Sequence, residues 1–330
     1  MRSMPLKVNV ILAALLVVLA TYPLYGELLF PQQHDYYLQK LTFIVILAIL
    51  AMSLDLLVGM SGLVSLAHAA FFGLAGYTLA LTAPQYEPIS LWIALPAALA
   101  AAAAAALVIG ALTLRTRGVY YILATLAFTQ MIYFVFHDSD FAGGSDGMFL
   151  FFKPTVSIGE RVLFDLEDRT TFYLFCLGAL AATYLLLRML LRSPFGHVLV
   201  GIKENEIRIR SLGYNPPVFK LIAFVIAGVF AGLAGFLAVA QYGFANPSLL
   251  GWHQSAEALL MVLLGGMGTL FGPVLGAFAF ELLHQLFAGW TEHWQLLMGA
   301  FVIAAVLLLP KGLGGLLLKL TRTRPPAGGG

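Results

Sequence analysis

Apolar runs of about 20 residues follow one another along most of this 330-residue chain, and this pattern constrains the fold more than any other feature. A helix of roughly 20 apolar residues crosses the hydrocarbon core of a bilayer, which is about 30 Å thick. Apolar residues make up 61% of the chain and charged residues 10%, which excludes a soluble globular domain. The sequence therefore predicts an all-α, polytopic membrane bundle, and residues 1–330 form a single membrane domain.

Polar and Pro/Gly-rich segments divide the chain into about ten candidate transmembrane spans. They lie near residues 8–25, 41–58, 62–82, 91–113, 119–136, 171–191, 217–242, 255–270, 273–289 and 294–309. The first run follows Met1, Arg2 and Lys7 and so resembles a secretory signal. It reaches span length and no A-x-A-like cleavage site follows, so we interpret it as a retained helix.

The distribution of basic residues predicts the orientation of these spans. With a cytoplasmic N-terminus, fourteen of the 18 Lys and Arg residues fall on the inside and four on the outside. This asymmetry follows the positive-inside rule and predicts that both termini are cytoplasmic. The long external interval, about residues 137–170, carries seven acidic residues against three basic ones and forms an acidic surface.

Several function classes find little support in the sequence. Few ionisable residues lie at membrane depth, and they form no chain that would relay protons in a secondary carrier. These residues are Asp55, His68, Glu257, Glu281 and His284. The Glu281–His284 pair at i, i+3 has the spacing of metal ligands, but we interpret it as a packing or interface pair. The single cysteine, Cys176, excludes an internal disulfide.

A cytoplasmic segment, residues 191–220, opens and closes with Pro/Gly turns. Between these turns apolar residues alternate with charged ones, which predicts a short amphipathic helix. Its apolar residues are Val198, Leu199, Ile202, Ile207 and Leu212. This helix either lies on the membrane surface or projects to a cytoplasmic partner.

Glycine is concentrated in residues 59–76, where it makes a thin helix that packs closely against its neighbours. Gly59 and Gly62 also mark a break at which the chain turns at the end of one span and re-enters the membrane. Ser65 and His68 then share one face, directed toward protein or a water-filled path. His68 is either an interhelical hydrogen-bonding residue or a substrate contact.

A second Gly-rich hairpin, residues 263–283, follows about 204 positions later in the same predicted orientation. Gly62, Ser65 and Leu66 align with Gly266, Thr269 and Leu270, which indicates a parallel internal repeat. We assign a helix-packing role to six glycines in the two hairpins. They are Gly59, Gly62, Gly73, Gly76, Gly265 and Gly266.

Five stretches in order along residues 41–316 resemble a known family. They are SLDLLVGMSGLVSLAHAAFFGLAGY (53–77), GVYYILATLAFTQM (118–131), GGSDGM (143–148), SPFGHVLVGIKENEIRIRSLGYNPPVFKLIAFVIAGVFAGLAGFL (193–237) and LLGGMGTLFGPVLGA (263–277). Together these stretches resemble the LivM-type inner-membrane permease subunits of branched-chain amino-acid ABC importers. The resemblance implies a second, LivH-like permease, two cytoplasmic ATPases and a periplasmic binding protein.

The resemblance also implies that residues 193–216 couple the permease to an ATPase, through Pro194, Gly196, Lys203, Glu204, Asn205, Glu206 and Gly213. It places the translocation path at two spans with neutral polar groups. These groups belong to Ser65, His68, Thr125, Thr129 and Gln130. The chain lacks a G-x-x-x-x-G-K-[ST] motif, so we expect a non-enzymatic transport subunit without cofactor, metal or nucleic acid, and ATP hydrolysis on separate subunits.

The implied cargo is leucine, isoleucine or valine, carried across the bacterial inner membrane. Three departures from the family pattern bear on this expectation: Ala67 before His68, the neutral pair Thr129-Gln130, and Asp55 where Asn is frequent. The alternatives are a urea or short-amide importer of the same architecture and a self-sufficient secondary amino-acid carrier.

Overall fold

The computed structural model describes residues 6–29, 31–158, 161–309 and 311–321, and helices dominate this part of the chain. The helices are α1 (Leu6–Leu29), α2 (His34–Asp55), α3 (His68–Thr82), α4 (Leu91–Thr113), α5 (Val119–His137), α6 (Arg169–Arg192), α7 (Pro194–Ser211), α8 (Pro216–Tyr242), α9 (Trp252–Gly265), α10 (Gly272–Ala288), α11 (Trp294–Leu308) and α12 (Gly312–Thr321). A π-helical turn, Leu56–Ser61, continues α2. The predicted all-α bundle is confirmed.

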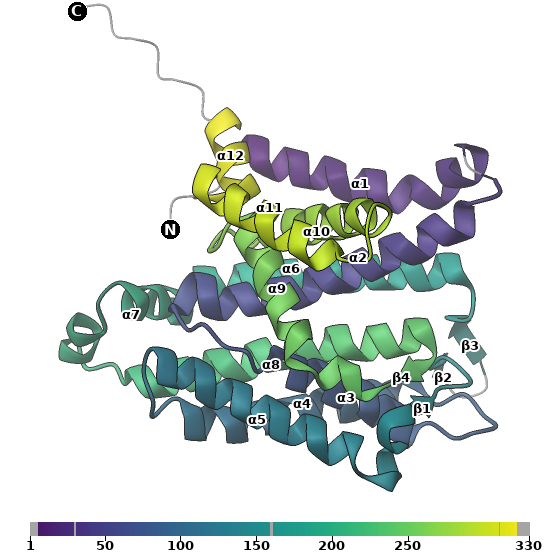
Figure 1. Cartoon of the computed structure of the whole chain (residues 1–330), viewed down its shortest axis with the longest axis horizontal. Coiled ribbons are helices and arrows are strands. Elements are labelled where there is room, and N and C mark those ends of the chain that lie inside the picture. Colours follow the sequence, from purple (N-terminus) through teal and green to yellow (C-terminus); the bar gives the residue numbers. More distant parts are fainter. Residues whose placement is uncertain (1–5, 30, 159–160, 310, 322–330) are drawn as a thin grey trace, which may run out of the picture.

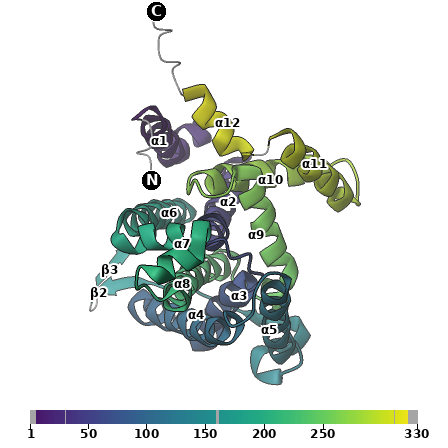
Figure 2. The same cartoon turned by 90° about the vertical axis from the view of Figure 1, so that its left-hand side faces the viewer.

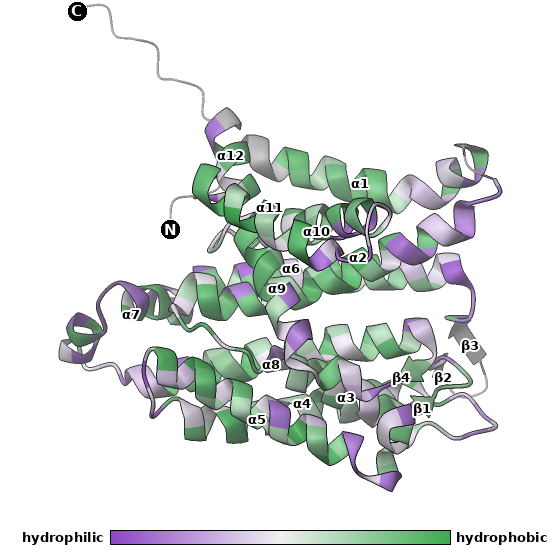
Figure 3. Cartoon of the chain, in the orientation of Figure 1, coloured by the Kyte–Doolittle hydropathy of each residue, from purple (hydrophilic) through white to green (hydrophobic). Residues whose placement is uncertain are grey.

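Short strands occur only in the loops at one end of the described structure. Strand β1 (Met148–Phe149) pairs antiparallel with β4 (Phe244–Ala245), and β2 (Val156–Ile158) pairs antiparallel with β3 (Arg161–Phe164). These strands lie on the right in Figure 1, whereas α7, the start of α1 and the end of α12 lie on the left. Apolar residues cover the sides of the helices between these two ends (Figure 3).

Helix α2 forms the centre of the bundle. It packs against α6 and α8 on one side and α9 and α10 on the other (Figure 2). Its residues 44–55 are all buried, which explains why this helix is apolar on every face. A helix buried in this way organises the elements around it.

Small residues form the close contacts of α8 with α3 and α4. A Cβ on Gly235 of α8 would lie 2.5 Å from the backbone carbon of Phe72 in α3. Cβ atoms on Gly228 and Gly232 would each lie 2.6 Å from an alanine methyl of α4, at Ala106 and Ala102. Lipid provides no hydrophobic force between helices, so close backbone approach supplies the packing energy.

Seven helical stretches are long and apolar enough to cross a membrane within the described residues: 10–28, 34–61, 91–113, 119–137, 169–192, 216–242 and 294–319. The other three predicted spans contain shorter helices: α3 has 15 residues, α9 has 14 and α10 has 17. The prediction that 62–82 is helical from its first residue is wrong, because residues 62–67 are non-helical and α3 begins at His68. The count of ten crossings stays a prediction.

Candidate functional site

The helical backbone is interrupted at the position that the glycines predicted. Helix α2 and its π-turn end at Ser61, and Gly62 has φ 73°, a left-handed conformation that favours glycine. Residues 62–67 follow as a non-helical segment, which we call the first break, and α3 begins at His68. The first break leads from the end of α2 toward the middle of the bundle (Figure 1).

Three side-chain hydroxyls hydrogen-bond the backbone of the first break. The Leu66 carbonyl accepts bonds from Thr129 Oγ1 at 3.0 Å and from Ser255 Oγ at 2.9 Å. The Leu66 N–H donates to Thr125 Oγ1 at 3.2 Å, and the Ala69 N–H donates to Ser255 Oγ at 2.8 Å. Non-helical backbone persists at membrane depth only when such partners satisfy it. These hydroxyls therefore make the break possible.

The predicted path residues gather at this break, but their roles differ. Thr125 and Thr129 lie one turn apart on α5 and face the break. Ser65 lies inside the break, and its Oγ accepts a bond from the Ala67 N–H at 3.1 Å. The predicted helical face shared by Ser65 and His68 is wrong, because only His68 belongs to the helix. Sequence reasoning also missed Ser255, whose only signal is a hydroxyl just before an apolar run.

His68 is the first residue of α3 and is fully buried. Its ring packs edge-on against Phe71, with ring centroids 5.9 Å apart. Among the described residues, neither ring nitrogen makes a hydrogen bond of good geometry, although the Ser53 backbone lies close enough to interact with the ring. The Gln130 Nε2 atom is also buried and lacks a partner in the same part of the chain. Buried polar atoms are normally paired, so these two residues are open to a further partner.

A second break has the same length and register as the first. Helix α9 ends at Gly265, residues 266–271 are non-helical, and α10 begins at Gly272. Each of these positions is 204 residues beyond its counterpart in the first break, and Gly266, like Gly62, has a positive φ. The backbone thus repeats the pattern that the sequence alignment of the two hairpins indicated.

The end of α2 connects the second break to α7. The Asp55 carboxylate accepts bonds from the Gly268 N–H at 2.7 Å and the Leu270 N–H at 3.2 Å. The Lys203 ammonium of α7 donates to the Gly59 carbonyl at 2.6 Å. A cation at the C-terminal end of a helix is stabilised by the helix dipole. We call these three hydrogen bonds the α2 link.

Four of the six glycines assigned to packing allow a close approach of neighbouring atoms, and the other two allow a turn of the backbone. Cβ atoms on Gly59, Gly73, Gly76 and Gly265 would all lie within 2.7 Å of another residue's atoms, whereas Gly62 and Gly266 take positive φ at the start of the two breaks.

The predicted amphipathic helix is α7, and it is kinked. Asn205 has φ −157° and ψ 96°, and its Oδ1 accepts a bond from the Arg208 N–H at 2.9 Å. Val198, Leu199 and Ile202 are buried before the kink. Ile207 and Leu212 are 79% and 66% exposed after it, so they do not share the buried face of Val198, Leu199 and Ile202. The kink changes the direction of the helix and leaves them on the surface of the chain.

The seven predicted coupling residues fall into internal and exposed groups. Gly196 packs against the backbone of Leu191. Lys203 reaches back to α2. Glu206 forms ion pairs with Lys220 at 2.7 Å and Arg210 at 3.0 Å, and the hydrogen bond from Lys220 lowers the pKa of its carboxyl group.

The other four predicted coupling residues lie either at the two ends of α7 or on its exposed surface. Pro194 begins α7, and Gly213 follows it with φ 90°. Glu204 and Asn205 are exposed at the kink. The exposed face of the element therefore combines charged residues with Ile207 and Leu212.

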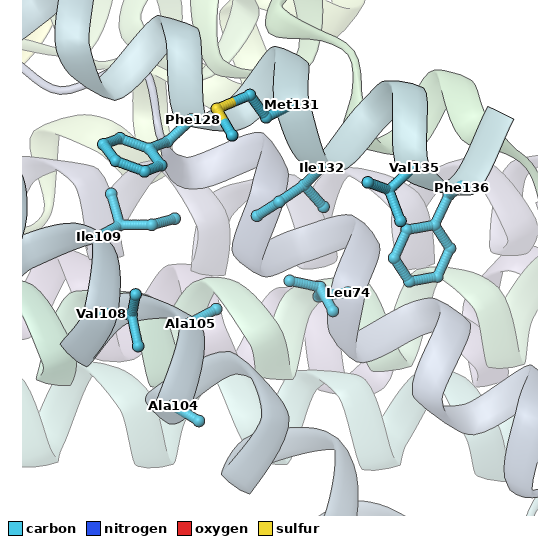
Figure 4. Close-up of a pocket in the computed structure, with 10 residues that line it drawn as sticks. All are labelled: Leu74, Ala104, Ala105, Val108, Ile109, Phe128, Met131, Ile132, Val135 and Phe136. Atoms are coloured by element: carbon cyan, nitrogen blue, oxygen red, sulfur yellow. The ribbon is translucent and has the colours of Figure 1, made fainter. Parts of the chain in front are cut away.

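A groove of about 440 Å³ lies between α3, α4 and α5 (Figure 4). Its lining is apolar, with Leu74, Ile109, Phe128 and Met131 among the side chains, and it contains none of the predicted path residues. Elsewhere, the Nδ1 atom of His284 lies 3.5 Å from the Glu281 carboxylate. No group of three potential metal ligands occurs among the described residues.

The chain is similar to known membrane transport proteins. The family model described as "Branched-chain amino acid transport system / permease component" matches residues 36–308. The high-affinity branched-chain amino acid transport system permease proteins LivM of Salmonella typhimurium and Escherichia coli are each 33% identical to the chain over 303 residues, covering 86% of this chain and 70% of each relative. The autoinducer 2 import permease LsrC of Photorhabdus laumondii is 34% identical over 130 residues, 36% of this chain and 38% of its own. No solved structure matches the sequence significantly.

Proposed function

The chain belongs to the family of permease components of branched-chain amino acid transport systems, and from this membership we propose that it carries leucine, isoleucine and valine across the bacterial inner membrane as one subunit of an ABC importer. The 33% identity to LivM over 86% of the chain is the observation that carries the proposal. Two breaks at membrane depth support it, because discontinuous helices line substrate paths in transporters.

The importer needs further subunits. The chain has no P-loop motif, so ATP hydrolysis belongs to two cytoplasmic ATPase subunits. A second, LivH-like permease completes the membrane part, and a periplasmic binding protein delivers the cargo. Within residues 1–330, the segment 193–216 is the coupling element that contacts an ATPase.

We propose ten membrane crossings with both termini in the cytoplasm. The distribution of basic residues supports this topology, as does the position of α7 at the same end of the bundle as the start of α1 and the end of α12 (Figure 1).

Cysteine labelling tests this topology. Asp146 and Glu204 are exposed, and the native Cys176 is buried and should not react. A membrane-impermeant maleimide should label Asp146→Cys in intact spheroplasts and Glu204→Cys only after the membrane is opened. Labelling of both positions from one side would contradict the topology.

We propose that the first break is part of the translocation path, with Ser65, His68, Thr125, Thr129 and Gln130 as its polar groups. The buried ring nitrogens of His68, which make no hydrogen bond of good geometry to the described residues, support this role most directly. An aliphatic amino acid suits a path that is mostly apolar and offers a few neutral hydrogen-bonding groups. The hydroxyls of Thr125 and Thr129 would serve the path by keeping the break open.

Uptake of labelled L-leucine by the reconstituted complex tests both the function and the path. The wild-type complex should accumulate leucine only with ATP, and isoleucine and valine should compete while urea does not. His68→Leu removes no hydrogen bond of good geometry to the described residues, so the complex should assemble normally but lose uptake at least tenfold, whereas His68→Gln should be milder.

Ser255→Ala is the structural comparison for this experiment. It leaves the Ala69 N–H without its partner and should lower the free energy of unfolding by about 1–3 kcal/mol, as judged from a melting measurement.

Two results of the uptake experiment would contradict the proposals. ATP-independent leucine entry would argue for a secondary carrier, and normal uptake by His68→Leu would remove His68 from the path.

Ile207 gives the sharpest test of the coupling element, because its side chain is 79% exposed and it lies beyond the kink. Ile207→Asp should reduce ATPase association or leucine uptake at least tenfold, while insertion of the permease is unchanged. Ile207→Val, which keeps the apolar surface, is the matched control. Glu206→Lys is less informative, because it also breaks the ion pair with Lys220. Normal complex yield and normal leucine uptake in Ile207→Asp would show that this surface makes no functional contact with an ATPase.

A further inference from the structure

A polar cavity lies at the end of the bundle that carries the strands, well separated in the chain from both breaks. It has a volume of about 320 Å³ and is bounded by the start of α2, the start of α6, the end of α8 and the loop before α6. These element ends meet on the right in Figure 1. A water molecule takes about 30 Å³ of liquid volume, so the cavity has room for roughly ten waters or one small organic molecule.

One side of the cavity carries a positive charge without a direct ion pair. The Lys153 ammonium lies 4.4 Å from the centre of the Phe172 ring, and none of the ion pairs among the described residues includes it, although the nearby Glu167 and Asp168 carboxylates attract it at longer range. Burial lowers the pKa of this ammonium group. The nearby Arg169 is already paired with Asp35 at 2.7 Å. Lys153 is therefore the cation of the cavity that is open to a ligand carboxylate.

A buried acceptor without a donor belongs to the same cavity. The Gln241 Nε2 atom donates to the Gln39 carbonyl at 2.7 Å, and this bond fixes which end of the amide is the oxygen. The Oε1 atom is buried and has no partner within the described structure. Glu167 also lines the cavity, and its Oε1 atom accepts a bond from the backbone N–H of Lys153 at 2.7 Å. The cavity therefore holds two oxygen acceptors, Gln241 Oε1 and the Glu167 carboxylate, that could bind a cationic hydrogen-bond donor.

The remaining surface of the cavity is partly apolar. Leu38 and Phe172 line it and are 1% and 3% exposed. A ligand that satisfies every feature needs a carboxylate for Lys153, a hydrogen-bond donor for Gln241, and an aliphatic part for Leu38 and Phe172. A small amino acid carries all three groups on a short skeleton.

We propose that this cavity is an external binding site for one zwitterionic amino acid with an aliphatic side chain. Lys153 binds its carboxylate, while Gln241 Oε1 and Glu167 bind its ammonium group. The choice of an aliphatic side chain rests on the proposed function, but the zwitterion is argued from the cavity itself. The site lies within one subunit, so it does not require the second permease for completion.

Binding of labelled L-leucine to the purified importer complex, without ATP and without the binding protein, tests this site. Lys153→Gln should weaken leucine binding at least tenfold without changing the melting temperature, and Lys153→Arg should retain most of the affinity. The matched control is Lys40→Gln, because Lys40 is an external lysine that packs on Tyr36 outside the cavity. This control should bind leucine as the wild type does.

Two leucine analogues test the two ends of the zwitterion. Isovalerate lacks the ammonium group and isoamylamine lacks the carboxylate, so each should compete at least tenfold more weakly than leucine. Equal leucine binding by Lys153→Gln and the wild type, or competition by isovalerate as strong as that of leucine, would overturn the site. Because ATP-driven uptake is measured separately, loss of the site leaves the proposed function standing, whereas absence of leucine uptake by the wild type contradicts that function.

Discussion

Irregular backbone inside a membrane must find hydrogen-bond partners within the protein, and this constraint governs the structure. The chain interrupts its helices twice at equivalent positions, residues 62–67 and 266–271. The first break is satisfied by hydroxyls from α5 and α9, and the second by the carboxylate of Asp55. Each break therefore depends on a side chain distant in the sequence, which ties the helices of the bundle into one unit.

The α2 link gives this constraint a mechanical consequence. Lys203 connects α7 to the π-helical end of α2, and Asp55, one turn earlier on α2, connects that end to the second break. A displacement of α7 would be transmitted along these bonds rather than absorbed by a flexible loop. Under the proposed function, ATPase movements at α7 would reach the interior of the permease by this route.

The sequence predicted those parts of the molecule that depend on local composition. Hydropathy located the helices, and the glycines at 59 and 62 located the first break, while the alignment of Gly62 with Gly266 indicated a repeat. The predicted span 255–270 ran through the second break, which begins after Gly265. The partners of the breaks could not be predicted, because Ser255 and Asp55 act across 189 and 213 positions of the chain, respectively. The kink at Asn205 was also missed, since a helical apolar pattern continues through it in the sequence. Long-range hydrogen bonds and local bends leave little trace in composition or periodicity.

The most direct measurement of the α2 link compares Lys203→Met with the wild type in the reconstituted importer. Methionine keeps most of the apolar stem of lysine but cannot donate to the Gly59 carbonyl. We predict normal assembly and continued ATP hydrolysis, with ATP-driven leucine uptake reduced at least tenfold, and recovery of uptake in Lys203→Arg, which restores a donor. Normal uptake by Lys203→Met, or loss of uptake explained entirely by failed assembly, would contradict a role for the link in coupling.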